Sequence, residues 1–405
     1  MTTVRPIRET IPLDEARALV FDAAVPIERS ERISIREAHG RVIAHAEVSP
    51  MDVPPFDRAA MDGYAVIAED TFGASTFEPK TLHCIETVFT GQVPRERVSR
   101  GTCIEIATGA PLPDGADAVV MVEETEKTGA DQIRVLTPVY PRQHVGRRGA
   151  DITAGQSLFT RGDVLTPSRV GALAAMGIIE VEVFARPRVA ILSTGNEIIN
   201  PGQPLGPGQL YDINQFTLAA ITGAHGGAAV VYPTAADSLE ALTAAVSATE
   251  GDDLLVFSGG SSVGERDLII DVIGRMGEVI FHGIAVKPGK PTAFGRIDRR
   301  PVFGMPGYAT SCLSNAYMLL VPMLRRIARL PEYQPRSVRL PLSRRIVSTT
   351  GRHQFYTVRI ETGAAVPAFK ASGDITSMAQ ADGYIEIPAQ TDLVEAGEMV
   401  DVKLF

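Results

Sequence analysis

Short apolar runs alternate with helix-like segments between about residue 189 and residue 330. The runs at 189–192, 228–232, 254–257 and 284–286 are too short for helices and are typical of buried strands. Segments between them, such as 237–249, carry apolar residues at helical spacing. Strand–helix alternation of this kind predicts a mostly parallel sheet that helices cover on both faces.

The segments on either side have a different pattern. Short apolar runs with turn residues between them predict β structure through residues 80–145 and again from 332 to 405. Nearer the N-terminus, the pattern predicts helices at 11–24 and 166–176 and strands at 33–35, 41–44 and 178–183. Breaks in the pattern fall near residues 48, 145, 185 and 332.

Composition restricts the function further. The 405 residues are 45% hydrophobic and carry a net charge of −9, which argues against nonspecific nucleic-acid binding. No apolar run is long enough to span a membrane, so we expect a soluble, cytoplasmic protein without membrane contacts. Three cysteines without metal-ligand spacing suit a reducing compartment.

A glycine- and serine-rich loop follows the run at 254–257. It extends from Ser258 through Gly259, Gly260 and Ser261 to Gly264. Successive backbone N–H groups in such a loop can form a nest for phosphate or another oxyanion. A turn that needs glycine only for its shape is the alternative, and the loop alone does not decide between them.

Charged side chains lie near the same predicted strand ends. Lys287 and Lys290 are held on a backbone stiffened by two prolines, which suits an oxyanion, although a basic surface turn has the same pattern. Glu197, Asp237 and Asp267 are hard ligands of the kind that Mg²⁺ prefers. Asp237 and Asp267 could instead cap their own helices.

The predicted edge of the sheet is the strongest argument from the pattern alone. Ligands bind such sheets outside the carboxyl ends of the strands, where Glu197, Asp237, Ser258 to Asp267 and Pro306 are all expected. The loop at 258–264 has no lysine before its helix, so an ordinary P-loop ATPase is disfavoured. No Gly-x-Ser-x-Gly motif or Ser/His/Asp arrangement indicates a hydrolase.

Five motifs in order carry a resemblance to a known family. They are Phe56-Asp57-Arg58-Ala59-Ala60-Met61-Asp62-Gly63-Tyr64-Ala65, Ala107-Thr108-Gly109-Ala110-Pro111-Leu112-Pro113, Ser193-Thr194-Gly195-Asn196-Glu197, Ser258-Gly259-Gly260-Ser261-Ser262-Val263-Gly264 with Asp267, and Lys287-Pro288-Gly289-Lys290-Pro291. Together they resemble the molybdopterin molybdenumtransferases, the family of bacterial MoeA and the gephyrin E domain. The resemblance extends over nearly the whole chain.

The resemblance implies a multidomain α/β plus β fold. Residues 1–48 and 146–184 would form a segmented N-terminal domain, with a mainly-β domain inserted at 49–145. Residues 185–331 would form the α/β molybdopterin-binding domain, whose sheet is mostly parallel. Residues 332–405 would form a small C-terminal domain that resembles a β-barrel. The family forms homodimers.

The resemblance also implies the reaction. Molybdate is inserted into adenylylated molybdopterin with Mg²⁺ as cofactor, and AMP is released. The enzyme that adenylylates molybdopterin and the chaperones of molybdoenzymes would be partners. The implied functional positions are Asp62, Thr108, Asp151, Glu197, Asp237, Asp267 and Lys287, with metal ligands among the three carboxylates at 197, 237 and 267. The implied substrate site comprises Ser258, Gly259, Gly260, Ser261, Gly264, Lys290, Pro306, Ser311, Arg352 and Ser372.

The chain departs from the family pattern at two places. Tyr308 and Ala309 stand where the family usually has asparagine and proline, and Gly283 stands where many members have lysine. These departures leave open a divergent paralogue that binds molybdopterin as a scaffold or that handles tungstate.

Overall fold

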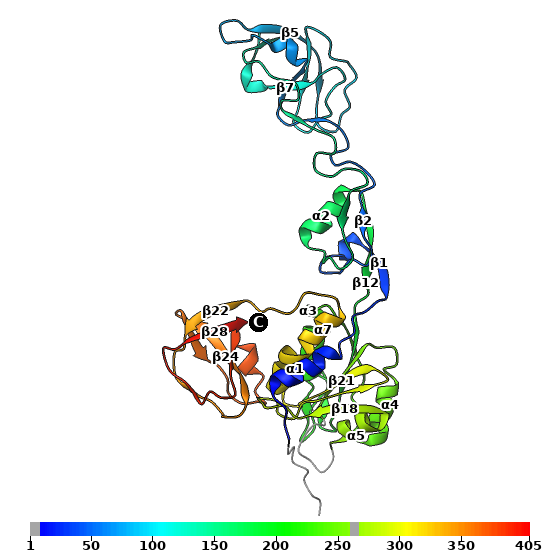
Figure 1. Cartoon of the computed structure of the whole chain (residues 1–405), viewed down its shortest axis with the longest axis vertical. Helices are drawn as coiled ribbons and strands as arrows, with labels where there is room; N and C mark the ends of the chain where they lie inside the picture. Colours follow the sequence, from blue (N-terminus) through cyan, green and yellow to red (C-terminus); the bar gives the residue numbers. More distant parts are fainter. Residues whose placement is uncertain (1–8, 260–266) are drawn as a thin grey trace, which may run out of the picture. The chain divides into compact units, whose positions relative to one another are not determined.

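The computed structural model describes residues 9–259 and 267–405, and the chain divides into two compact units (Figure 1). The larger unit contains the chain up to Glu31, residues 40–42 and residues 183–405. The smaller unit contains residues 32–39 and 43–182. Strands β1 (Ser30–Ser34) and β12 (Glu180–Phe184) each include a point where the chain passes from one unit to the other.

The larger unit is built around a six-stranded sheet. In spatial order its strands are β16 (Ala228–Val231), β13 (Arg188–Ser193), β17 (Leu254–Ser258), β21 (Arg300–Met305), β20 (Ala293–Ile297) and β18 (Gly277–His282). The first four are mutually parallel, and β20 is antiparallel to both of its neighbours. Strand β18 therefore runs in the same direction as β17 and β21, so five strands have their carboxyl ends at one edge.

Helices cover both faces of this sheet, as the alternating pattern predicted (Figure 1). Val189 and Ile191 of β13 belong to a core that α1 (Leu13–Asp22), α3 (Asn214–Ala224) and the helix at 309–327 also line. Ala190 and Leu192 point to the other face, against α4 (Leu239–Ser247) and α5 (Leu268–Met276). The helix at 309–327 comprises α6 (Ala309–Asn315), a π-helical stretch (Ala316–Leu320) and α7 (Val321–Ile327).

The end of the chain forms a second, β-rich part of the larger unit. Its sheet contains β19 (Val286–Lys287), β24 (His353–Glu361), β26 (Gly383–Ile387), β28 (Met399–Leu404) and β22 (Ser337–Pro341), and β25 (Ala364–Pro367) pairs with β24. Strand β23 (Ile346–Val347) pairs with β27 (Leu393–Val394), and α8 (Thr376–Ala379) is a short helix.

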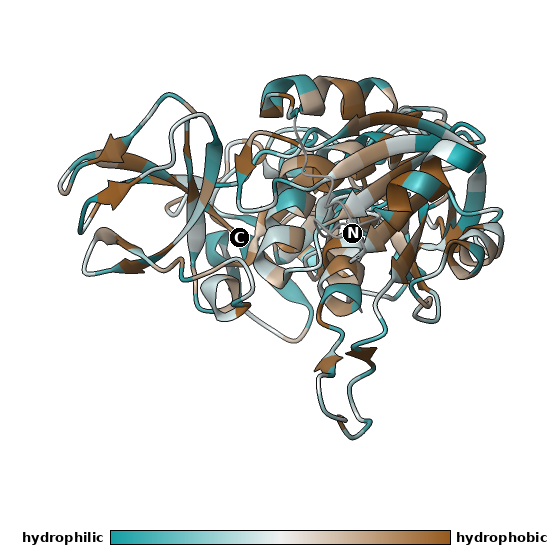
Figure 2. Ribbon diagram, turned by 90° about the horizontal axis from the view of Figure 1, so that it is seen from below, coloured by the Kyte–Doolittle hydropathy of each residue, from teal (hydrophilic) through white to brown (hydrophobic). Residues whose placement is uncertain are grey.

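In Figure 2 the hydrophobic residues lie mainly in strands and helices, and the loops are mostly hydrophilic.

The smaller unit is mainly β. Its largest sheet has the order β7 (Ala118–Met121), β4 (Gly63–Val66), β6 (Thr102–Ile106), β5 (Lys80–Val88), β9 (Gln132–Val135) and β8 (Thr125–Lys127). Two short pairs join β10 (Val145–Gly146) to β3 (Arg58–Ala59) and β11 (Ser157–Phe159) to β2 (Glu47–Val48). Its α-helix is α2 (Pro167–Ala175), which Thr166 caps, and short 3₁₀ turns lie at 35–37, 68–71 and 122–124.

The predicted fold class is confirmed, with two local corrections. Residues 41–44 do not form the predicted strand, because consecutive backbone groups bond to separate segments: Val42 accepts from Phe184, and Ile43 donates to Asp163. The strand predicted at 284–286 is displaced to β19 and does not extend the central sheet. It pairs with β24, where Val286 lies opposite His353. None of the helices in the described ranges is long and apolar enough to cross a membrane.

Candidate functional site

The loops after the parallel strands are connected to one another by backbone hydrogen bonds. The N–H of Thr194, after β13, donates to Ser258 O at 3.0 Å, and the N–H of Gly259 donates to Met305 O of β21 at 3.3 Å. The side-chain amide of Asn214 donates to Gly307 O at 2.8 Å. These contacts join the ends of β13, β17 and β21 to the start of α3. We call the residues at this edge of the sheet the carboxyl-edge site, which comprises residues 193–197, 212–214, 258–259, 267, 282, 287–292, 306–311 and 315.

Gly259 is needed for this close approach. Its φ is +97°, and a Cβ atom there would lie 2.5 Å from the carbonyl oxygen of Thr194. An alanine would therefore combine an unfavourable backbone conformation with a clash against main chain. Ser258 is buried and ends β17. Gly260, Ser261 and Gly264, which belong to the predicted nest, lie outside the described residues.

Asp267 lies at the start of α5 and has two partners. Its Oδ1 accepts a hydrogen bond from the N–H of Ile270 at 3.3 Å, so the side chain does cap the helix. Its Oδ2 lies 3.1 Å from Nε2 of His282, the last residue of β18. Asp267 is therefore held at the carboxyl edge by two elements. A capping role and a role at the site are both consistent with this position.

The lysine loop extends from the same edge. The N–H of Ile284 donates to Lys290 O at 3.0 Å and that of Gly283 donates to Thr292 O at 2.9 Å, which closes the loop. The ammonium group of Lys287 donates to the hydroxyl of Thr349 at 2.8 Å. The N–H of Arg352 in turn donates to Thr349 O. The structure thus brings Lys287 together with the turn that carries Arg352.

The lysine loop, residues 287–292, is held by the buried side-chain amide of Asn315. Asn315, at the end of α6, donates from Nδ2 to Gly289 O at 2.8 Å and to the hydroxyl of Thr292. Gly289 has a φ of +98°, and a Cβ atom at this position would lie 2.3 Å from Asn315 Nδ2. The shape of the loop therefore depends on a glycine and an asparagine that fit against each other.

The beginning of α6 contacts the loop that contains Ser372. The N–H of Thr310 donates to Ser372 O at 3.1 Å, and its hydroxyl donates to Asp374 O at 2.9 Å. Ser311, the next residue, is buried. The structure therefore places the backbone of Ser372 against Thr310, the residue that precedes Ser311. Pro306 lies just before this helix, directly after β21.

Glu197 and Asp237 are exposed carboxylates. Glu197 lies in the loop that follows β13, and Asp237 lies in the segment that precedes α4. Both Oε atoms of Glu197 would lie 2.9 Å from a Cβ on Gly195, so this carboxylate folds back over a glycine whose φ is +135°. The predicted cap of α4 by Asp237 is wrong. Ser238 is the N-cap, because its hydroxyl accepts from the N–H of Ala241, three residues further on.

The sequence pattern does not mark several polar residues here as buried. Within the described chain, five side-chain oxygens in or beside the carboxyl-edge site are buried without a hydrogen-bond partner, namely Ser193 Oγ, Thr194 Oγ1, Asp212 Oδ2, Asn214 Oδ1 and Asn315 Oδ1. Buried polar atoms normally have partners, so a cluster of unsatisfied ones indicates a place for water or a polar ligand. The run of small polar residues that ends at Asn315, just before the apolar part of the helix, is the signal that could have found it.

The carboxylates alone do not form a metal centre. Among the described residues, no group of three or more His, Cys, Asp or Glu side chains could hold a metal ion. Mg²⁺, however, is usually bound by one or two carboxylates together with substrate phosphates and water. The exposed Glu197 and Asp237 fit that kind of shared site better than a closed one.

The remaining predicted residues belong to the smaller unit. The carboxylate of Asp62 accepts a hydrogen bond from the N–H of Thr108 at 2.7 Å, and this bond lowers the pKa of Asp62. Both side chains are exposed. Asp151 is also exposed, and its N–H donates to Val53 O. The structure therefore brings Asp62 and Thr108 together, whereas the backbone of Asp151 bonds to the segment that contains Val53.

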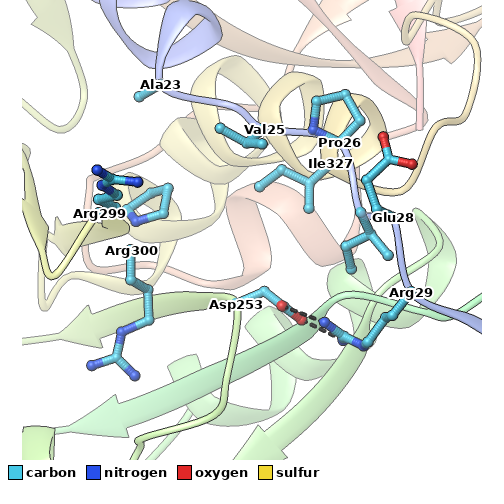
Figure 3. Close-up of a pocket in the computed structure, with 11 residues that line it drawn as sticks. Ala23, Val25, Pro26, Glu28, Arg29, Asp253, Arg299, Arg300 and Ile327 are labelled. Atoms are coloured by element: carbon cyan, nitrogen blue, oxygen red, sulfur yellow. Dashed lines mark hydrogen bonds and ion pairs between the residues drawn. The ribbon is translucent and has the colours of Figure 1, made fainter.

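The larger unit also contains a cavity of about 300 Å³ (Figure 3). Asp253, on its wall, immediately precedes β17, so the cavity is at the amino-terminal end of that strand, whereas Ser258 is at the carboxyl end. Arg29 forms two 2.6 Å contacts with Asp253 there. None of the predicted site residues lines this cavity.

Comparison with known proteins supports one assignment for the whole chain. Three family models match it in succession: the MoeA N-terminal region (domain I and II) at residues 11–177, a probable molybdopterin binding domain at 190–326, and the MoeA C-terminal region (domain IV) at 339–405. Molybdopterin molybdenumtransferase 2 of Mycobacterium tuberculosis is 35% identical over 91% of this chain and 94% of its own length. The chain belongs to the MoeA family.

Other MoeA-type proteins agree over the full length. The molybdopterin molybdenumtransferase of Haemophilus influenzae is 30% identical, and the match covers 98% of both chains. Two crystal structures of molybdopterin biosynthesis MoeA protein from Pyrococcus horikoshii match with TM-scores of 0.83 and 0.81, at 41% and 32% identity. Each covers 98% of this chain and at least 99% of the other. The likeness thus includes both units and the C-terminal β region.

Proposed function

We propose that this MoeA-family protein is a cytoplasmic molybdopterin molybdenumtransferase that inserts molybdate into adenylylated molybdopterin and releases AMP. The observation that carries the proposal is the carboxyl-edge site, where the lysine loop, Asp267 and the ends of β13, β17 and β21 meet. The full-length likeness to proteins named for this activity supports it. The enzyme that adenylylates molybdopterin would supply the substrate.

The residues of the site divide into anion-binding and carboxylate groups. Lys287 and Lys290 supply positive charge for the oxyanion, with Arg352 nearby through the Thr349 turn. The N-terminus of α5, close to Asp267, is the place in this site where a helix dipole would favour the phosphate of the nucleotide. Holding the oxyanion in line with the reacting phosphate would account for much of the acceleration.

We propose that one or two of the carboxylates at Glu197, Asp237 and Asp267 would hold Mg²⁺ together with the substrate phosphate and water. When bound, Mg²⁺ neutralises negative charge on the phosphate from which the AMP is released. The carboxylates of this chain orient the phosphate and keep its charge at the sheet edge. Asp267 is the most firmly held of the three, since Ile270 and His282 both contact it.

Release of AMP from purified protein tests the activity. We expect AMP only when adenylylated molybdopterin, molybdate and Mg²⁺ are all present, and we expect Asp267→Asn to reduce turnover at least about tenfold, or about 1.4 kcal/mol of barrier. Asp271→Asn is the matched control, because Asp271 lies exposed one turn along the same helix. A folded protein that binds molybdopterin but releases no AMP would favour the scaffold alternative. Faster turnover with tungstate than with molybdate would favour the alternative of a paralogue that handles tungstate.

A lysine variant tests the oxyanion role separately. Lys287→Met should weaken molybdate binding in calorimetry while leaving the fold intact, because the residue loses one charge and one hydrogen bond to Thr349. Lys127→Met, in the smaller unit, is the control. Equal molybdate affinity of both variants would exclude Lys287 from the oxyanion site.

We further propose a homodimer. Exposed apolar residues gather along β15 (Leu210–Tyr211) and the beginning of α3, where Leu210 is 62% exposed and Phe216 is 55% exposed. Surface of this kind commonly marks a protein contact. Sedimentation analysis of wild type and Phe216→Glu should show a dimer that the variant weakens. A monomeric wild type at micromolar concentration would refute the proposal.

A further inference from the structure

Two cysteines of the smaller unit lie side by side in its main sheet. Cys84 of β5 is directly opposite Cys103 of β6 in the parallel ladder, and neither forms a disulfide. Adjacent strands are about 4.8 Å apart, which is inside the Cα separation of about 4.4–6.8 Å that a disulfide spans. Both side chains pack on the same core cluster, so they share one face of the sheet.

The two thiols differ in their environments. Cys103 is fully buried, whereas Cys84 is only partly buried and therefore accessible from solvent. The ladder shifts its register between Cys84 and Glu86, so the backbone next to Cys84 is less constrained than in a regular pair. One thiol can thus meet a reagent while the other stays beside it in the core.

The neighbouring thiol also activates Cys84. A hydrogen bond from Cys103, assisted by a backbone hydrogen bond from Glu105, lowers the pKa of Cys84 to about 6, although burial and the charge of the Glu105 carboxylate oppose the shift. The same bond raises the pKa of Cys103. Cys103 is therefore the hydrogen-bond donor that favours the thiolate form of Cys84. When it is protonated, the Cys84 thiol donates to Glu86 O at 3.4 Å.

We propose that Cys84 and Cys103 form a dithiol site that small-molecule disulfides oxidise reversibly to an intramolecular disulfide. The Cys84 thiolate attacks one sulfur of the reagent RSSR, whose S–S bond breaks, and RS⁻ leaves and takes up a proton from solvent. Cys103 then attacks Sγ of Cys84, loses its proton to the second departing RS⁻, and closes the Cys84–Cys103 bond. The net change converts two protein thiols and RSSR into one protein disulfide and two RSH.

The expected rate advantage of Cys84 is small, so the site of reaction is the better test. At pH 7 a thiol with a pKa near 6 is about 90% thiolate, against about 3% for an ordinary cysteine. The lower pKa also makes the thiolate less nucleophilic, which leaves a net gain of about twofold. What distinguishes the pair is the second step, because an isolated cysteine would stop at the mixed disulfide.

Peptide mapping after incubation of the full chain with oxidised glutathione tests the proposal. Wild type should lose two hydrogen atoms in mass and yield one cross-linked species joining tryptic peptides 81–95 and 101–127, and dithiothreitol should reverse both changes. Cys103→Ser should instead retain glutathione on Cys84, and Cys103→Ala serves if the serine variant folds poorly. Cys84→Ser should form neither product.

The third cysteine is the matched control. Cys312 is fully buried, and Cys312→Ser should cross-link 81–95 to 101–127 as wild type does. The proposal fails if wild type keeps glutathione on Cys84, because Cys103 would then not reach it. It also fails if Cys84 stays unmodified under conditions in which the urea-unfolded chain reacts.

Discussion

The contact between Gly289 and Asn315 allows a quantitative test of how the lysine loop is held. Gly289→Ala would place a methyl group 2.3 Å from Asn315 Nδ2, at a backbone φ of +98°. A non-glycine residue in a left-handed conformation costs about 1–2 kcal/mol. The clash adds about 1–3 kcal/mol of overpacking. We therefore expect this variant to lose about 2–5 kcal/mol of stability.

Asn315→Ala separates the two contributions. It removes two hydrogen bonds, to Gly289 O and Thr292 Oγ1, which are together worth about 1–3 kcal/mol. It also removes the atoms against which the new methyl group would clash. The double variant should therefore be more stable than the sum of the single changes predicts, by at least about 1 kcal/mol.

Urea unfolding measures this coupling. Tyrosine fluorescence can follow it, because the chain has no tryptophan, and hydrogen exchange can assign the transition to the larger unit. Ser314→Ala is the control, since Ser314 is buried in the same helix and bonds to Ser311 O, away from Gly289. Combined with Gly289→Ala it should be additive within about 0.5 kcal/mol. Additivity of the Asn315 pair as well would refute the proposed fit.

Three further predictions follow from single residues. Burial disfavours the charge of Glu386, but His353, Arg17 and Lys403 together lower its pKa to about 2, so its ionisation stabilises the fold above pH 4.5. Between pH 4.5 and pH 2, wild type should therefore lose about 3 kcal/mol of stability that Glu386→Gln does not lose. Denaturation curves with equal pH dependence for the two proteins would contradict this. Ser238→Ala should cost about 1 kcal/mol of stability, because α4 loses its helix cap. Asp237→Ala should leave the stability unchanged but lower the rate of AMP release. A loss of stability in Asp237→Ala but not in Ser238→Ala would show that Asp237 is the cap. Alkylation of Cys84 by iodoacetamide should change less than about twofold from pH 7 to 9, because its pKa is already lowered, whereas a cysteine with an ordinary pKa would speed up about 20-fold.

The sequence predicted the central sheet because buried strands and amphipathic helices leave strong periodic patterns. It also predicted that Ser258, Asp267 and Lys287 belong to one edge, since parallel strands end together. It could not predict that Lys287 bonds to Thr349, because the two residues are 62 positions apart and no local pattern relates them. The pairing of β19 with β24 could not be predicted for the same reason, because tertiary contacts between distant segments decide it.

Helix caps show a second limit of the sequence. Asp237 and Ser238 are adjacent, and either side chain can accept a hydrogen bond from a helix N-terminus. Only the backbone geometry decides that Ser238 does so. At α5, by contrast, Asp267 stands between Arg266 and Leu268, whose side chains cannot accept a hydrogen bond, and the expected cap is present. Buried asparagines such as Asn315 escape prediction because their partners lie in loops distant in sequence.

Anomalous diffraction from crystals soaked in molybdate tests the central claim most directly, because it locates the oxyanion without assuming a role for any residue. We expect a molybdenum peak at the carboxyl edge of the central sheet, beside Lys287 and the turn of Thr349 and Arg352, and we expect the peak to be lost in Lys287→Met. A peak in the cavity lined by Arg29, Arg299 and Arg300 at the opposite edge, or the same peak at full height in Lys287→Met, would contradict it.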